Sequence, residues 1–401
     1  MKSMKRTLVS LLFVVAAIGM FPGGASAQWV LLDPESNLLV NEGLDHMYNL
    51  RYTEADSVFR ELAKKDPTHP AGYFLMALVD WWKIVPNTDV ETKVSRFSET
   101  FNRKIDKVIE VSDARLEKNG GDIVGLFFKA SALGYRARLV TLTLGTSGSP
   151  LDMLSGFMDG NKAYEILLLC QRLAPSNRDI LLGSGLFQYM SAYIPEKYPS
   201  YKPMLGFLPP GDKQLGLNML RIASENARYA STEAKYSLLE ILSLMEKDYA
   251  QGKQLAYELH QKYPGNPVFY KFFARNAYLN GDNAVADSAW YDILRKVDAR
   301  ESGYELTLAR QGLYYLGDIR LQAGNLESAM RLLQQADKLS GRLDDGEDNS
   351  WSVMTHLKMG YIYDKQNRRK DALREYERVL DMDEYNNSHQ TAKKYIATAY
   401  K

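Results

Sequence analysis

The C-terminal half of the chain repeats one pattern of apolar, small and polar positions. In residues 359–379, a helical run that contains Gly360 is followed by a polar turn and by a second run that contains Ala372. The same pattern predicts helical hairpins in residues 43–67, 273–293 and 316–336, and the second helix and closing proline of another in residues 252–264. Equivalent small residues in the second helices are separated by 34, 43 and 43 residues; they are Gly252, Ala286, Ala329 and Ala372. The sequence therefore predicts an all-α protein built from repeated hairpins.

This pattern resembles the tetratricopeptide repeat (TPR), a unit of two antiparallel helices with a period of about 34 residues. In that family, small residues occupy the two positions at which the helices approach most closely. Gly360 and Ala372 stand at these positions, and Gly43 and Ala55 do so near the start of the chain. The resemblance implies a TPR-like α-solenoid, a right-handed superhelix of antiparallel helix pairs, over most of residues 36–401.

The N-terminal part also has a helical pattern, with fewer repeat signatures. Residues 70–85 carry aromatic side chains, including Trp81 and Trp82, on more than one face, which predicts a helix buried on several sides. A long amphipathic helix is expected over residues 91–118, followed by a pair at 123–142 and 160–173. We expect the Gly- and Ser-rich segment between the last two to be a loop. The only cysteine, Cys170, falls at a core position of the second of these helices.

The central segment, residues 180–216, is the least regular part of the chain. It predicts a helix, a Pro- and Tyr-rich crossover at 195–210, and a new helix that begins at Gly211-Asp212. This layout is similar to the central signature of the tetratricopeptide repeat protein 39 family, which includes fungal inclusion-body clearance proteins. The matching residues are Gly183, Gly185, Phe187, Ser191, Pro195, Leu205, Phe207, Gly211, Asp212, Gly216 and Leu217. The resemblance implies a shared architecture and no activity, since those relatives act as adaptors inside cells.

Five prolines in the crossover predict that neither flanking helix continues through it. Its apolar side chains, which form a candidate crossover patch, are Tyr198, Tyr201, Met204 and Phe207. Two arrangements are open: the patch packs against the inner face of the superhelix, or it is exposed and contacts a membrane or a partner. Exposure of the four side chains together would favour lipid contact.

The first 27 residues predict a secretory signal. A basic start is followed by the apolar run Leu8–Met20 and by a small-x-small cleavage site that ends at Ala27, so we expect the mature chain to begin at Gln28. Removal of this segment changes the formal net charge from +1 to −2, which gives no electrostatic reason to expect a nucleic-acid partner. No later segment has the composition of a transmembrane helix. We expect export, most simply to the periplasm of a Gram-negative bacterium, with outer-membrane association or extracellular release as alternatives.

Residues that could perform chemistry are sparse. The five histidines are scattered along the chain without a second ligand at metal spacing, and no nucleotide-binding or nucleophile motif is present. We therefore expect no metal, no cofactor and no enzymatic activity. An enzyme would need a deep pocket with ionisable groups brought together from distant parts of the sequence.

The binding hypothesis follows from the repeat resemblance, which implies that certain first-helix positions line the concave face. In the C-terminal repeats these positions predict partner-binding residues, which are Lys271, Arg275, Tyr278, Tyr314, Asp318, Gln322, Tyr361 and Asp364. Their mixed chemistry suits a protein or peptide partner, and a solvated role that only keeps the solenoid soluble is equally open. The family's clamp for C-terminal carboxylates is not matched, because Arg275 and Tyr315 stand where asparagines are needed.

The sequence thus predicts four parts. Residues 1–27 form a signal peptide, 28–179 N-terminal TPR-like helix pairs, 180–228 a helix pair with the crossover, and 229–401 a C-terminal TPR array with a capping helix. The predicted function is that of a non-enzymatic, exported scaffold that binds a protein or peptide partner in its groove. The alternative is an adaptor at a membrane surface or the outer membrane that uses the crossover.

Overall fold

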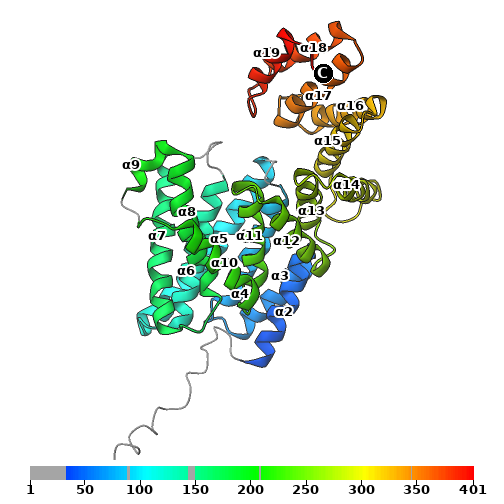
Figure 1. Cartoon of the computed structure of the whole chain (residues 1–401). Helices are drawn as coiled ribbons and strands as arrows, with labels where there is room; N and C mark the ends of the chain where they lie inside the picture. The colour runs from blue at the N-terminus through cyan, green and yellow to red at the C-terminus, as the bar shows by residue number, and fades with distance from the viewer. Residues whose placement is uncertain (1–32, 88–90, 143–149, 207–208, 345) are drawn as a thin grey trace, which may run out of the picture.

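The computed structural model describes residues 33–87, 91–142, 150–206, 209–344 and 346–401, and every regular element within these ranges is helical (Figure 1). The chain is an all-α solenoid of TPR type, as the sequence predicts. None of the described helices combines the length and the apolar character that crossing a bilayer requires. The predicted signal segment lies outside the described residues.

The helices follow one another as antiparallel neighbours along the chain. The N-terminal ones are α2 (Pro34–Tyr48), α3 (Tyr52–Lys65), α4 (Ala71–Ile84), α5 (Glu91–Lys118), α6 (Ile123–Leu142) and α7 (Pro150–Leu173). The central ones are α8 (Ile180–Lys197), α9 (Lys202–Leu205), α10 (Lys213–Asn226), α11 (Ser231–Glu240) with the π turn η3 (Ile241–Met245), and α12 (Tyr249–Lys262). The C-terminal ones are α13 (Pro267–Leu279), α14 (Asn283–Asp298), α15 (Leu306–Gln322), α16 (Leu326–Leu343), α17 (Ser350–Lys365), α18 (Arg369–Asp381) and α19 (Ser388–Ala397).

Glycines hold the predicted hairpins together by allowing close approach. A Cβ atom added to Gly360 of α17 would lie 2.4 Å from the ring of Tyr376 on α18, and one added to Gly43 of α2 would lie 2.2 Å from Phe59 on α3. Both aromatic side chains are fully buried against these glycines. The hairpin frame predicted from the sequence is therefore confirmed at both ends of the chain.

Helix α4 is buried on several sides, as its aromatic composition predicts. Trp81 and Trp82, adjacent in sequence, point in different directions and are both fully buried. Trp81 packs against α5 and α6 through Phe101 and Tyr135, whereas Trp82 packs against α11 and α13. Helix α4 thus contacts helices on several sides and lies at the centre of the N-terminal packing.

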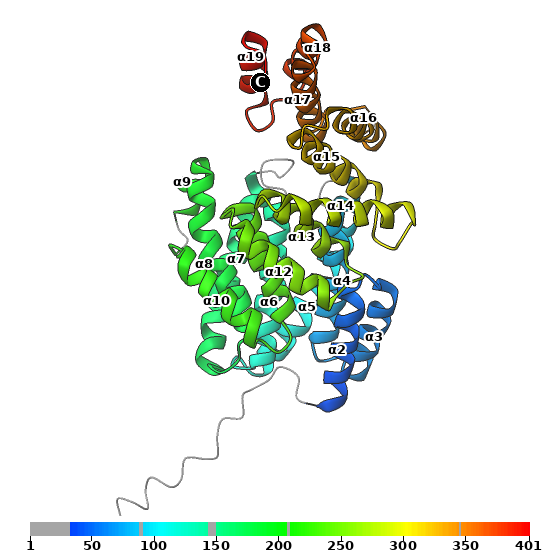
Figure 2. The ribbon, with the colours of Figure 1, turned by 45° about the vertical axis from the view of Figure 1, so that its right-hand side comes forward.

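Helices α2–α13 wind into a superhelix whose two ends touch each other. The side-chain amide of Asn266, just before α13, donates a 2.9 Å hydrogen bond to the backbone carbonyl of Tyr48 at the end of α2. The rings of Tyr48 and Tyr263 are 5.0 Å apart, and the hydroxyl of Tyr229 donates to Asn37. We call α2–α13 the closed superhelix. Helices α14–α19 continue from it as an arm that projects away from its end (Figures 1 and 2).

Two predictions about helix boundaries were wrong. Helix α7 begins at Pro150 and not at residue 160, because a proline at the first helical position has a fixed φ angle that suits the helix and needs no hydrogen bond there. Helix α8 continues through Pro195 to Lys197, and most of the remaining crossover is helical too. Pro195 is tolerated because it lies in the last turn, where only one backbone hydrogen bond is lost.

Candidate functional site

The sequence-predicted groove residues lie on α13, α15 and α17, the first helices of the C-terminal hairpins. The structure brings three of them together: the hydroxyl of Tyr278 donates to Asp318, and the amide of Gln322 lies 3.1 Å from the same carboxylate. Lys358 completes this network with an ammonium group 2.8 Å from Asp318 Oδ1. Asp318 is only 1% exposed, so it fixes the neighbouring repeats to each other. Lys358 was not predicted from the sequence.

The second predicted carboxylate, Asp364 on α17, is also engaged internally. It accepts hydrogen bonds from Arg369 at 2.9 Å, from the hydroxyl of Tyr376 at 2.9 Å and from the backbone N–H of Tyr400 at 2.8 Å. The ring of Tyr400 stacks on Tyr361, with centroids 4.1 Å apart and planes 10° apart. The segment that contains Tyr400 therefore packs against α17 and covers the ring of Tyr361.

The remaining predicted groove residues differ in accessibility. Tyr314 is buried and packs edge-on against Trp351 at 5.5 Å. Lys271 and Arg275 of α13 are half-buried, and Arg275 Nη1 is a buried nitrogen with no hydrogen-bond acceptor among the described residues. Gln322 is exposed and Tyr361 is half-buried. A partner could thus reach Lys271, Arg275 and Gln322, whereas Tyr361 is covered by Tyr400 and the side chains of Tyr314, Asp318 and Asp364 are buried.

In the crossover patch, Tyr198 and Tyr201 are half-buried and belong to a small apolar cluster with Phe157, Ile194 and Leu205. The rings of Phe157 and Tyr201 are 6.3 Å apart. Phe207 and the side chain of Met204 lie outside the described residues. The two described tyrosines pack against α7 and do not form a jointly exposed surface.

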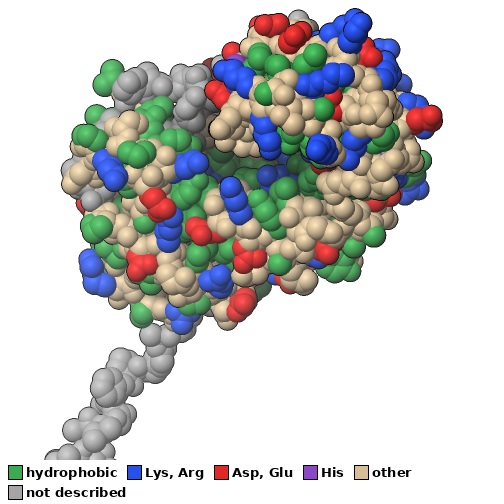
Figure 3. Space-filling model, turned by 45° about the horizontal axis from the view of Figure 1, so that its top comes forward, with side chains coloured by type: hydrophobic (Ala, Val, Ile, Leu, Met, Phe, Trp, Pro, Cys, Tyr) green, Lys and Arg blue, Asp and Glu red, His purple; other side chains and the backbone are tan. Residues whose placement is uncertain are grey.

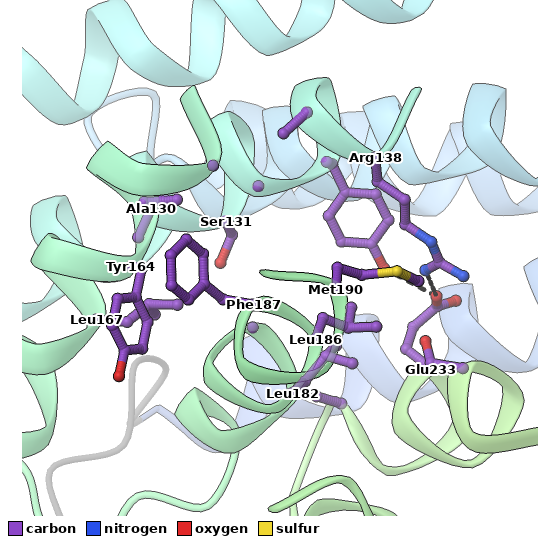
Figure 4. A pocket seen from close by; sticks show the side chains of 18 of the residues that line it. Ala130, Ser131, Arg138, Tyr164, Leu167, Leu182, Leu186, Phe187, Met190 and Glu233 are labelled. Atoms are coloured by element: carbon purple, nitrogen blue, oxygen red, sulfur yellow. Dashed lines mark hydrogen bonds and ion pairs between the residues drawn. The ribbon is translucent and has the colours of Figure 1, made fainter. Parts of the chain in front are cut away.

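The closed superhelix surrounds a cavity of about 490 Å³ that the sequence did not predict. Its walls come from α2, α4, α6, α7, α8, α11 and η3, and they are mostly apolar and aromatic (Figure 4). The volume is within the range of about 300–1,000 Å³ that is usual for small-molecule sites.

One wall of this cavity carries a buried ionic cluster. Glu233 of α11 accepts hydrogen bonds from Trp82 Nε1 at 2.5 Å and from the hydroxyl of Tyr135 at 2.8 Å. Arg138 of α6 lies 3.9 Å from Glu233 and donates a 2.5 Å hydrogen bond to Glu240. Burial raises the pKa of Glu233, although the charge of Arg138 and the hydrogen bonds from Trp82 and Tyr135 oppose this shift. The cluster joins α4, α6 and α11 around the cavity.

Two further polar side chains on the wall each have one oxygen atom without a hydrogen-bond partner among the described residues. Ser237 of α11 is 1% exposed and its hydroxyl makes no hydrogen bond. Asp179, just before α8, accepts two backbone hydrogen bonds at Oδ1, from Tyr229 and Ala230, while its Oδ2 is unpaired. Burial raises the pKa of Asp179. Buried polar atoms usually have partners, so these two are candidate contacts for a ligand.

Sequence reasoning missed the cavity because its lining looks like ordinary core. Leu182, Leu186 and Met190 of α8 have the spacing of any buried helix face. The sequence feature that could have indicated the site is a charged residue, Arg138 or Glu233, within a helix whose other residues are mostly suited to packing. Within the described ranges, no group of three or more His, Cys, Asp or Glu side chains is placed to hold a metal ion.

Comparisons with known proteins give structural likeness only. No protein-family model matches the sequence, and no curated protein matches it. Among solved structures, the human IFIT1 dimer with PPP-AAAA is 11% identical, with 92% of this chain and 88% of that chain covered and a TM-score of 0.42. Yeast Tom70 is 12% identical, with coverage of 91% and 95% and a TM-score of 0.28.

A tetratricopeptide repeat protein from Parabacteroides merdae is 17% identical, with 80% of this chain and 99% of that chain covered and a TM-score of 0.31. These TM-scores are below one half, so no property of the three proteins is transferred to this chain. Its architecture rests on its own helical hairpins.

Proposed function

We propose that this protein is a non-enzymatic scaffold that binds an extended segment of a protein partner along the groove of α13, α15 and α17. The observation that carries the proposal is the position of residues 398–401. Their backbone N–H at Tyr400 bonds to Asp364, and the Tyr400 ring stacks on Tyr361. The α17 part of the proposed groove thus accommodates a non-helical segment with an aromatic side chain, which supports the proposal that a partner segment binds there.

The charges along the groove favour an acidic or carbonyl-rich segment. Asp318 and Asp364 are neutralised by Lys358 and Arg369, whereas Arg275 Nη1 has no acceptor among the described residues. Lys271 and Arg275 are half-buried, and the accessible parts of these cationic side chains suit a carboxylate or a backbone carbonyl of a partner. Aromatic and arginine side chains of this kind commonly carry most of the energy of an interface.

Crosslinking and affinity recovery from the native cell envelope test the proposal. The groove variant carries Lys271→Ala and Arg275→Ala, and Tyr314 is left intact because it is buried. The matched control carries Arg295→Ala and Arg331→Ala, which remove two arginines from the exposed faces of α14 and α16. We expect one protein to be recovered by the parent and the control and to be lost by the groove variant. Equal recovery by all three would contradict the groove as the binding site.

A membrane-surface function through the crossover is the second candidate, and the packing of Tyr198 and Tyr201 does not favour it. Cosedimentation of the parent protein with anionic vesicles would support this function if the substitutions Tyr198→Ser and Tyr201→Ser abolished the binding. A nucleic-acid partner is not favoured inside the superhelix, because the described lining residues include three carboxylates and one guanidinium, that of Arg138, which already pairs with two of them. Catalysis is not favoured either, because neighbouring side chains already pair with the carboxylate of Glu233.

Export to the periplasm is also part of the proposal and rests on the pattern of residues 1–27. N-terminal sequencing of the protein from a periplasmic fraction should begin at Gln28, and recovery of the uncleaved chain from the cytoplasm would contradict it. The likeness of residues 183–217 to the tetratricopeptide repeat protein 39 family is proposed as one of architecture alone.

A further inference from the structure

Beyond partner binding in the groove, we propose that the cavity of the closed superhelix binds a single-chain, uncharged lipid. Such a molecule has one long apolar body and a hydroxyl-bearing head, as a monoacylglycerol has. The proposal rests on the shape and lining of the cavity, the charges on its wall and the exposure of its mouth.

The body of the ligand is specified by the walls. Leu186, Phe187 and Met190 of α8 line the cavity although each is only half-buried, so part of their apolar surface faces its interior (Figure 4). Phe187 is held in place by stacking on Tyr164 at 4.0 Å. The lining continues from Val40 of α2 to Leu205 of α9, across the full set of helices that enclose the space. An elongated apolar chain would cover these surfaces and exclude water from them.

The head of the ligand is specified by the charges. The described lining residues include three carboxylates, Asp179, Glu233 and Glu240, and one guanidinium, Arg138, which already contacts two of the carboxylates. An anionic head would meet an excess of negative charge in a desolvated site. An uncharged hydroxyl avoids this repulsion. It can donate a hydrogen bond to Asp179 Oδ2 or to Ser237 Oγ, and it can accept one from the hydroxyl of Ser237.

The mouth of the cavity is apolar and open to solvent. Leu142 at the end of α6 and Leu244 of η3 both line the cavity and are 37% and 48% exposed. Figure 3 shows that the surface is hollowed between the closed superhelix and the C-terminal arm, with hydrophobic side chains inside the hollow. This opening lies close to the paired Arg138 and Glu240, which precede Leu142 and Leu244 by four residues on the same helices.

The first experiment measures binding of Nile red, an uncharged apolar fluorophore, to the purified protein. Leu186→Trp narrows the cavity, and Leu215→Trp adds the same bulk to an exposed position of α10 outside it. We expect saturable binding by the parent and the control and an affinity at least tenfold weaker for Leu186→Trp. Absence of saturable binding by the parent, or equal binding by all three, would overturn the proposal. Ser131→Phe, on the opposite wall, replaces Leu186→Trp if that variant loses its helical circular dichroism.

The second experiment identifies the head group by competition with monoolein, oleate and oleylamine, each below its aggregation concentration. We expect monoolein to displace Nile red at a concentration at least tenfold lower than oleate does. Ser237→Ala should weaken the binding of monoolein several-fold and leave the affinity for Nile red unchanged. Equal or stronger displacement by oleate, or by oleylamine, would overturn the assignment of an uncharged head.

Discussion

The indole Nε1 of Trp82 donates a 2.5 Å hydrogen bond to Glu233 Oε1, although the two residues are 151 positions apart in the sequence. Both side chains are buried, and the same carboxylate accepts from Tyr135. The bond connects the second repeat of the chain to the helix that begins the C-terminal array. It is therefore a central part of the contact that turns an open solenoid into the closed superhelix.

Replacing Trp82 with Phe should destabilise the protein more than the same change at Trp81. The two indoles are adjacent and equally buried, but Trp81 Nε1 has no hydrogen-bond partner in the described part of the chain. Both substitutions remove similar volume, and only Trp82→Phe removes a hydrogen bond to a charged group. Such a bond contributes about 1.5–3 kcal/mol. Urea unfolding followed by circular dichroism should show this difference, and equal midpoints would mean that the bond contributes nothing to stability.

A methyl group at Gly360 should also be costly. An added Cβ would lie 2.4 Å from the ring of Tyr376, which is buried and hydrogen-bonded to Asp364 and so cannot easily move. Overpacking of this kind costs about 1–3 kcal/mol, so Gly360→Ala should lower the unfolding free energy by that amount.

The matched control is Gly341→Ala in α16, where an added Cβ meets no atom within 4 Å. There the alanine should stabilise the helix by about 0.5–1 kcal/mol. If both alanines changed stability in the same direction, the close approach of α17 and α18 would not determine the need for glycine.

The single thiol should be unreactive in the folded protein. Cys170 is fully buried in a cluster with Leu167, Ala174 and Ile180, and burial raises the pKa of its thiol to about 12. Because the thiolate is the reacting species, iodoacetamide at pH 8 should not modify the native protein and should modify it fully in denaturant. Mass spectrometry distinguishes the modified from the unmodified protein. Rapid modification under native conditions would mean that α7 and α8 separate often.

The sequence predicts the hairpins because the contacts that define them are local. Gly360 and Tyr376, or Gly43 and Phe59, are a few turns apart, so the spacing of small and aromatic residues is sufficient. The contact between Tyr48 and Asn266 depends instead on the twist accumulated over the ten intervening α-helices, α3 to α12, which no local pattern records. The cavity forms because the superhelix closes, so no local sequence pattern predicts it either. The partner-binding roles of Lys271 and Arg275 stay predictions.

The stability of the arm should depend on pH through His356 of α17. Its Nδ1 is 2.6 Å from Glu375 on α18, and its Nε2 is 3.2 Å from Asp337 on α16. Burial alone would lower the pKa of His356, but hydrogen bonds and attraction to these two carboxylates outweigh it, and the pKa is raised above 6.5. A protonated His356 therefore ties three helices together.

Because the folded-state pKa exceeds the unfolded value, this contribution is fully present below pH 6.5 and is lost as the pH rises through the folded-state pKa. His356→Gln keeps a hydrogen-bonding group but cannot carry the charge. The melting temperature of the parent should exceed that of His356→Gln clearly at pH 6, and the difference should shrink by pH 9. The same comparison in a Glu375→Gln background should give a smaller difference at pH 6. A difference that is constant with pH would mean that the pKa of His356 is the same in the folded and the unfolded protein, and a difference that grows with pH would mean that the two carboxylates fail to offset its burial.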